Sequence, residues 1–114
     1  MTEELWKDIE GFEGLYQVST LGRVRSLDVV KHFYPMERKP YTQLRKGKVL
    51  KPYRGPANFL KVLLYKDGEI ARKTVHHLVA EAFLENPMGR KMVWFKDGDK
   101  TNTRLDNLKW SKYD

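Results

Sequence analysis

Apolar and polar side chains alternate in two short stretches near the start of the chain, as they do in strands with one buried face. The stretches span residues 16–19 and 23–27, and a turn that contains Gly22 separates them. Alternation around a glycine-containing turn predicts a β-hairpin. The second stretch places Arg23 and Arg25 on the same face, because successive side chains of a strand point to opposite sides. One face of the predicted hairpin is therefore rich in arginine.

A second hairpin and a helix are predicted further along the chain. Residues 59–65 are mostly apolar, and residues 70–75 can return beside them because the Asp-Gly dipeptide at 67–68 favours a tight hairpin turn. Over residues 75–83 the apolar spacing changes to every third and fourth position, which predicts an amphipathic helix. The Asn-Pro dipeptide at 86–87 ends the helical pattern.

The last part of the chain has the signals of another small hairpin. Residues 92–95 resemble a strand, and an Asp-Gly dipeptide at 97–98 provides a turn. Residues 103–106 have the spacing of a capping box with Asp in the fourth place, so we expect a short helical turn there. Residues 107–110 then form a second strand-like run.

The middle of the chain, residues 31–58, shows no regular period. It contains four prolines together with Gly47 and Gly55, and we expect a basic, irregular segment with one short strand over 48–51. Such a segment can become ordered against a partner. The whole pattern predicts an α+β fold in three sections, which are a small β module over 1–30, the irregular segment over 31–58, and a hairpin, helix and second hairpin over 59–114.

The composition describes a folded domain and excludes several kinds of site. Of the 114 residues, 40% are hydrophobic and 12% are aromatic, more than a disordered chain carries. The absence of cysteine excludes disulfide bonds, thiolate zinc sites and cysteine nucleophiles. No apolar run reaches the roughly 18 residues of a membrane span, and the acidic start lacks the apolar core of a secretory signal. We therefore expect no membrane association and a cytoplasmic location.

The net charge of +7 comes from the middle of the chain. Residues 21–66 hold twelve basic and two acidic residues, a net charge of +10, whereas residues 1–20 carry −4 and residues 67–114 carry +1. A local excess of this kind is typical of a surface that contacts the phosphate backbone of nucleic acid, and the alternative is a surface that only solubilises the protein. Guanidinium and ammonium groups match phosphate oxygens. The candidate nucleic-acid contacts are Arg23, Arg25, Arg38, Lys39, Arg45, Lys46, Lys48, Lys51 and Arg54.

Two parts of the chain resemble a known family. Residues 6–19 and 22–27 resemble the nuclease-associated DNA-binding module at the N-terminus of many phage and intron-type HNH endonucleases. Residues 75–83, 97–102 and 104–110 look like the HNH nuclease domain of the same proteins. The resemblance implies double-stranded DNA as the partner, a bacterial host cell as the location, and a ββα-metal section at the end of the chain.

The chain departs from this family where the active site is expected. The family uses a histidine as general base and an adjacent Asn or Asp as metal ligand, but Trp94 and Phe95 stand at this pair. Neither aromatic side chain can accept a proton from water or bind a hard cation. Asn107 matches the middle Asn of the family, so we interpret it as a vestigial active-site residue, and none of the seven residues after it is Asn or His. We therefore expect a degenerate and truncated metal-binding section, with no catalytic residue, no metal, no cofactor and no enzymatic activity.

Three functions remain open. The first is a DNA-binding protein that is derived from an HNH homing endonuclease and has lost cleavage. The second is a phage-type protein that binds and inhibits or modulates a host or defence protein with an acidic surface, with Trp94 and Phe95 as the candidate contacts. The third is an active, metal-dependent DNA nickase with a relocated site at one of the histidines. We interpret those histidines, His32, His76 and His77, as structural or surface residues.

Overall fold

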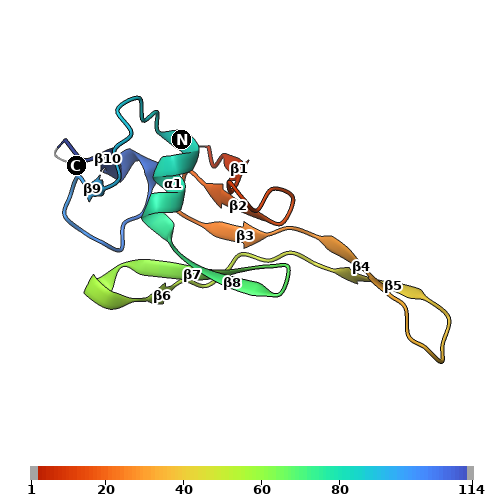
Figure 1. Ribbon diagram of the computed structural model, residues 1–114. Coiled ribbons are helices and arrows are strands. Elements are labelled where there is room, and N and C mark those ends of the chain that lie inside the picture. Colours follow the sequence, from red (N-terminus) through yellow and green to blue (C-terminus); the bar gives the residue numbers. More distant parts are fainter. Residues whose placement is uncertain (1–2, 113–114) are drawn as a thin grey trace.

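Four small antiparallel sheets and one α-helix make up the computed structural model, which describes residues 3–112 (Figure 1). The first sheet contains β1 (Trp6–Asp8), β2 (Tyr16–Ser19) and β3 (Val24–Ser26), and the second is a two-stranded ribbon of β4 (Val29–Phe33) and β5 (Tyr41–Arg45). The third sheet contains β6 (Tyr53–Arg54), β7 (Leu60–Lys66) and β8 (Glu69–Thr74), and the helix α1 (Val75–Phe83) follows it directly. The last hairpin pairs β9 (Val93–Phe95) with β10 (Leu108–Trp110), and two 3-10 turns complete the fold, η1 (Pro56–Asn58) and η2 (Leu105–Asn107).

The core lies where α1 meets three of the sheets. The apolar side of α1 buries Val75, Leu78 and Val79. These side chains belong to one cluster with Val18 of β2 and Leu64 of β7, and both of those side chains are fully buried. Because β10 also packs on α1, the first sheet, the third sheet and the last hairpin share a single core around the helix.

The predicted α+β class is confirmed, and so are several of its elements. The helix covers residues 75–83 as the apolar spacing predicted, and β7 and β8 form the predicted hairpin. Asp67 and Gly68 both have positive φ angles, 52° and 79°, which is the backbone of the tight turn that this dipeptide favours. The short turn near 103–106 is η2, but the Thr103 hydroxyl donates to the carbonyl of Gly22 instead of capping the turn.

The prediction of an irregular segment over 31–58 is wrong. Instead, β4 pairs with β5 along five residues of each strand, and β6 adds a short edge to the third sheet. Both faces of the ribbon are largely exposed, so its sequence shows no alternation of buried and exposed positions. The prolines at 35 and 40 lie in the connection between the strands, where they remove no ladder hydrogen bond. The short strand expected over 48–51 is only a single bridge between Arg25 and Val49.

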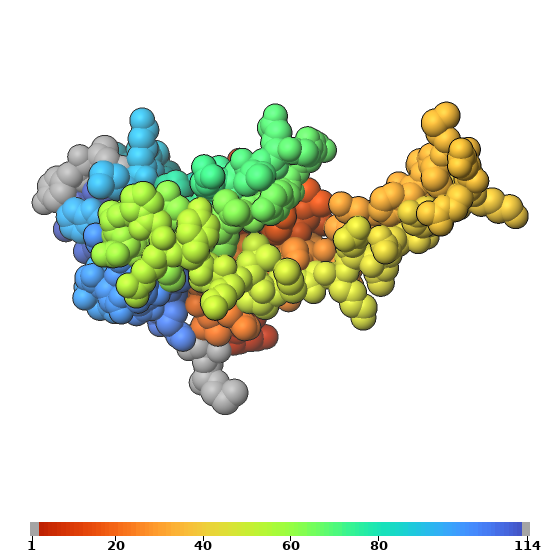
Figure 2. All heavy atoms as spheres, turned by 90° about the horizontal axis from the view of Figure 1, so that it is seen from below, coloured from red at the N-terminus to blue at the C-terminus, as the bar shows by residue number. Residues whose placement is uncertain are grey.

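The ribbon makes the molecule elongated. The principal extents are 59, 32 and 28 Å, and the radius of gyration is 16.8 Å, compared with about 13 Å for a compact domain of this length. Figures 1 and 2 show the β4–β5 ribbon projecting from the body that surrounds α1. The exposed, basic part of the sequence therefore forms an arm.

Candidate nucleic-acid interface

The β4–β5 ribbon is joined to the first sheet at its base by hydrogen bonds on both strands. The Ser26 N–H donates to the carbonyl of Lys48 at 2.9 Å, and the Lys48 N–H donates to the Ser26 hydroxyl at 3.0 Å. The Gly47 N–H donates to the carboxylate of Asp28 at 2.7 Å. These bonds extend the β3 ladder into the ribbon, so the ribbon has a defined direction relative to the body.

Exposed basic side chains occupy both strands of the ribbon, its turn and its base. The acidic residues of the same segment are Asp28, which is engaged at the base, and Glu37 in the turn. Lys31 on β4 was missed as a candidate, because the segment was expected to be irregular and a strand position could not be assigned to it. The ribbon cations are Lys31, Arg38, Lys39, Arg45, Lys46 and Lys48, and all six are exposed.

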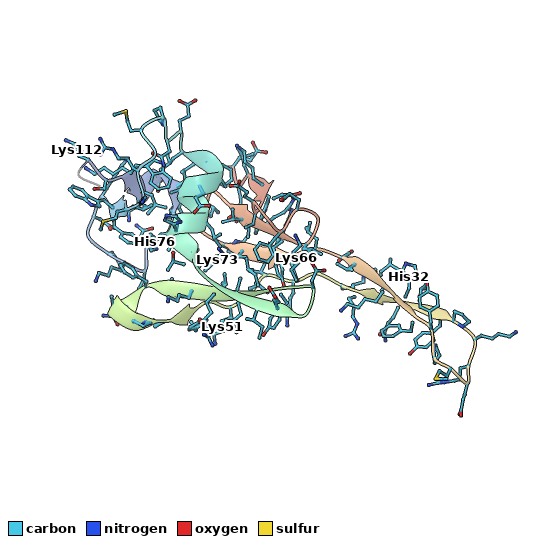
Figure 3. The ribbon with its side chains drawn as sticks, viewed as in Figure 1. His32, Lys51, Lys66, Lys73, His76 and Lys112 are labelled. Carbon is cyan, nitrogen blue, oxygen red and sulfur yellow. The ribbon has the colours of Figure 1, made fainter. Side chains whose placement is uncertain are left out.

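The remaining candidates lie on the body. Lys51 and Arg54 are exposed on the approach to β6 and within it, and Figure 3 places Lys51 beside the third sheet, away from the ribbon and His32. Arg23 and Arg25 belong to the first sheet, where both guanidinium groups have partners within the protein.

Glu4, Gln17 and Trp6 engage those two arginines. Arg23 forms a two-pronged ion pair with Glu4, and this hydrogen bonding holds the pKa of the Glu4 carboxyl below its usual range. Arg25 donates from Nε and Nη2 to the Gln17 side-chain oxygen at 3.0 and 2.6 Å, and its guanidinium lies 4.0 Å from the centre of the Trp6 ring. The predicted arginine-rich face exists, but its charge is partly satisfied within the sheet.

The β9–β10 hairpin separates the two aromatic candidates. Phe95 points toward the helix, where its ring lies 4.8 Å from the ring of His76 and 6.2 Å from that of Phe59. Trp94 points to the other side of the strand, is 37% exposed, and has the Lys109 ammonium 5.4 Å from its ring centre. A strand places adjacent side chains on opposite faces, so the two rings cannot form one paired surface.

Asn107 fixes the loop between β9 and η2. It is buried, its side-chain oxygen accepts from the Asp97 N–H at 3.0 Å, and its amide donates to the Asp97 carboxylate and the Asn102 carbonyl, both at 2.9 Å. The Asn102 amide donates to the same carboxylate, and mainly for this reason the pKa of Asp97 is lowered. Both polar atoms of the Asn107 side chain are therefore hydrogen-bonded to residues of this loop.

The side chains of this hairpin do not fit a metal ion. Trp94 and Phe95 offer no oxygen or imidazole ligand, and the Asn107 oxygen already accepts a backbone hydrogen bond. Across residues 3–112, no three His, Cys, Asp or Glu side chains lie close enough together to hold one.

The two helix histidines have separate surroundings. His76 is buried between Phe59 and Phe95, its Nδ1 has no hydrogen-bond partner among the described residues, and burial lowers its pKa to about 4. His77 pairs with Glu81 at 2.5 Å on one ring nitrogen and contacts the Lys91 carbonyl at 3.1 Å on the other. Both histidines therefore connect parts of the fold rather than share a ligand.

Comparison with known proteins identifies relatives over more than nine-tenths of the chain. Residues 4–64 match the NUMOD4 motif. The chain is 35% identical over 105 residues to DNA endonuclease I-HmuI of Bacillus phage SP01, and the match covers 92% of this chain and 51% of that relative. It is 34% identical over 111 residues to the uncharacterized HNH endonuclease L247 of Acanthamoeba polyphaga mimivirus, covering 94% of this chain and 23% of that relative.

A solved structure supports the same relationship. The structure describing DNA binding and cleavage by the HNH homing endonuclease I-HmuI superposes with a TM-score of 0.70 at 33% identity, over 94% of this chain and 52% of the other. The predicted resemblance to HNH homing endonucleases is therefore confirmed. The chain spans about half the length of I-HmuI. None of the helices in the described part is long and apolar enough to cross a membrane.

The comparisons correct one expectation. We expected the chain not to be an enzyme, but the relatives are named DNA endonucleases, and these names point to nuclease activity. The expectation rested on Trp94 and Phe95 and on the lack of Asn or His among the seven residues after Asn107, whereas the similarity extends over more than nine-tenths of the chain. A few substituted positions are too narrow a basis for excluding the activity that the names of these relatives indicate.

Proposed function

The chain belongs to the NUMOD4 motif family, and from this premise we propose that it binds double-stranded DNA as part of an HNH-type endonuclease. The observation that carries the proposal is the β4–β5 ribbon, which projects from the body and exposes basic side chains on both strands and in its turn. Duplex DNA carries one phosphate charge for about every 1.7 Å of its axis, so an arm of this kind can meet several phosphates at once.

The number of ribbon cations determines how strongly DNA binding should depend on salt. If all six neutralise a phosphate, the logarithm of the association constant should fall with the logarithm of the salt concentration with a slope of about −5, and each cation that contacts a base edge instead makes this slope less steep by about 0.9. A fourfold rise in salt then weakens binding by a factor on the order of 1,000. Arg23 adds little to this slope, because the Glu4 carboxylate already pairs with its charge. Arg25 is hydrogen-bonded to the neutral Gln17 amide and keeps its charge.

The test is a titration of a fluorescent 30-base-pair duplex at several salt concentrations, read by anisotropy. We expect tight binding at low salt and the steep decline given above. A response that stays flat between 50 and 200 mM salt would contradict DNA binding through this surface.

The same proposal includes a role in strand cleavage, in which the described residues hold and orient the duplex. We assign no catalytic side chain within residues 3–112, because the β9–β10 hairpin brings no metal ligand set together. Incubation of the protein with supercoiled plasmid and Mg²⁺ or Mn²⁺ tests whether these residues are sufficient. Nicked product that disappears with EDTA would show that the chain itself cleaves DNA.

Binding of a host or defence protein is the weaker candidate function. Its candidate contacts are Trp94 and Phe95, and of these Phe95 packs on His76 and Phe59 while Trp94 is exposed. No feature of the described residues favours such a partner over DNA, and we do not propose it.

A further inference from the structure

The cross-strand register sorts the ribbon side chains into two faces of different chemistry. Residues directly opposite each other in an antiparallel pair point to the same side. The pairs Val29–Arg45, Lys31–Gln43 and Phe33–Tyr41 define one face, which we call the polar face, and the pairs Val30–Leu44 and His32–Thr42 define the aliphatic face.

The polar face carries the hydrogen-bonding groups that suit base edges. Lys31, Gln43 and Arg45 are exposed, and their side chains make no hydrogen bond or ion pair with another residue of the described range 3–112. At the outer end of this face, the rings of Phe33 and Tyr41 stack with centroids 5.0 Å apart. This stacked pair packs the outer end of the ribbon, next to the three polar side chains. A ribbon that is packed in this way loses less conformational entropy when its side chains bind DNA.

The aliphatic face has one apolar pair, Val30–Leu44, next to the pair His32–Thr42. Val30 and Leu44 are opposite each other and 53% and 54% exposed, so they form an apolar pair in contact with solvent. An aliphatic pair cannot form hydrogen bonds with bases, although it can contact sugars or methyl groups.

We propose that the β4–β5 ribbon enters the major groove of DNA and reads sequence with its polar face, through Lys31, Gln43 and Arg45. This inference rests on the proposed DNA binding and adds which residues select the sequence. Two strands lie about 4.8 Å apart and carry side chains on both sides, which matches a groove about 12 Å wide. The hydrogen bonds at the ribbon base hold this face in one orientation relative to the body.

The chemistry of the polar face predicts the kind of sequence that it reads. A glutamine amide pairs with the N6 and N7 atoms of adenine, and an arginine or lysine pairs with the O6 and N7 atoms of guanine. Gln43 and Arg45 are two residues apart on one strand, about 6.8 Å. This spacing equals about two base-pair steps. The expected site therefore contains an adenine with a guanine about two base pairs away.

The experiment selects binding sequences from a library of random duplexes with the complete chain and with three variants. Gln43→Ala should remove the preference for adenine, and Arg45→Ala should remove the preference for guanine. Thr42→Ala is the matched control, because Thr42 directly precedes Gln43 on the same strand but lies on the aliphatic face. We expect it to recover the same sequence as the unchanged chain. Each polar-face variant should lose about 5- to 150-fold in discrimination between the selected base and its substitutes.

The outcomes separate this inference from the proposed function. Recovery of unrelated sequences by the unchanged chain, with salt-dependent duplex binding retained, would overturn sequence reading and leave DNA binding intact. Loss of the selected sequence in Thr42→Ala but not in Gln43→Ala would also overturn it, since the aliphatic face would then read the bases. Absence of any duplex binding would overturn both proposals. Circular dichroism and thermal melting of each variant establish that the fold is retained in these comparisons.

Discussion

Substitution of Gly47 by alanine should loosen the ribbon from the first sheet. A Cβ atom at this position would lie 2.1 Å from the carbonyl oxygen of Ser26 and 2.8 Å from the carbonyl carbon of Leu27. These neighbours are backbone atoms, so the two strands must separate by about 1 Å for the contact to approach the normal minimum. That shift breaks the three hydrogen bonds at the base, which join Gly47 to Asp28 and Lys48 to Ser26. At about 0.5–1.5 kcal/mol each, their loss lowers the local stability by about 2–4 kcal/mol.

Amide hydrogen exchange measures this loss where it occurs. In Gly47→Ala, the amides of Ser26 and Lys48 should exchange about 30 to 800 times faster, whereas the amide of Val18 in the core strand β2 should change little. Duplex affinity should fall by at least about tenfold, because the ribbon must be ordered again on binding. Val49→Ala is the control, since Val49 is exposed close by on the same chain segment. Unchanged exchange at the ribbon base, together with unchanged duplex affinity, would refute the anchoring role.

Three further substitutions test separate features. The double change Arg38→Ala and Lys39→Ala should make the salt slope of duplex binding less steep by about 1.8, measured by anisotropy, because two phosphate contacts are lost. His76→Phe should make the free energy of unfolding less sensitive to acid. The pKa of His76 is about 4 in the folded protein and 6.5 in the unfolded chain, so the unfolded chain takes up a proton first as the pH falls. Between pH 7 and pH 5 this difference lowers the free energy of unfolding of the unchanged chain by about 2 kcal/mol. Urea denaturation at pH 7 and pH 5 measures the difference between the two chains. Asn107→Ala should lower the free energy of unfolding by about 2–4 kcal/mol, measured in the same way, because three hydrogen bonds at Asp97 and its loop are lost.

Each of these expectations has an outcome that opposes it. Arg23→Ala serves as the charge control, and its slope should match that of the unchanged chain because Arg23 is paired with Glu4. An equal change in slope for Arg23→Ala would argue against the ribbon as the principal contact. A His76→Phe chain that loses as much stability on acidification as the unchanged chain would show that other groups cause the loss. An Asn107→Ala chain with unaltered unfolding would show that the loop does not depend on this side chain.

The helix and the hairpin before it were predictable because burial leaves a period in the sequence. One side of α1 faces the core, so apolar residues recur at helical spacing over 75–83, and the Asp-Gly turn at 67–68 requires residues that tolerate positive φ angles. The ribbon was not predictable in the same way. Its two faces are both exposed, so selection for burial leaves no alternation, and the prolines of its turn suggested irregular structure.

The candidate site was predictable in charge but not in geometry. The excess of basic residues in the middle of the chain is a property of the sequence, and six of those residues lie on the ribbon or at its base. Spacing also placed Arg23 and Arg25 on one face, but it could not show that Glu4, which precedes β1, and Gln17 of β2 meet them. Such partners are distant in sequence and adjacent only after the strands pair.

The sequence by itself determined the α+β class, the helix, the location of the positive charge and the resemblance to HNH endonucleases, because each depends on residue type and local spacing. The tertiary structure alone decided that the basic segment is a projecting ribbon, that Phe95 turns inward while Trp94 turns outward, and which side chains share the polar face. These features depend on register between strands and on contacts across the core. A shift of register by one residue would exchange the two faces of the ribbon without any change in composition or charge.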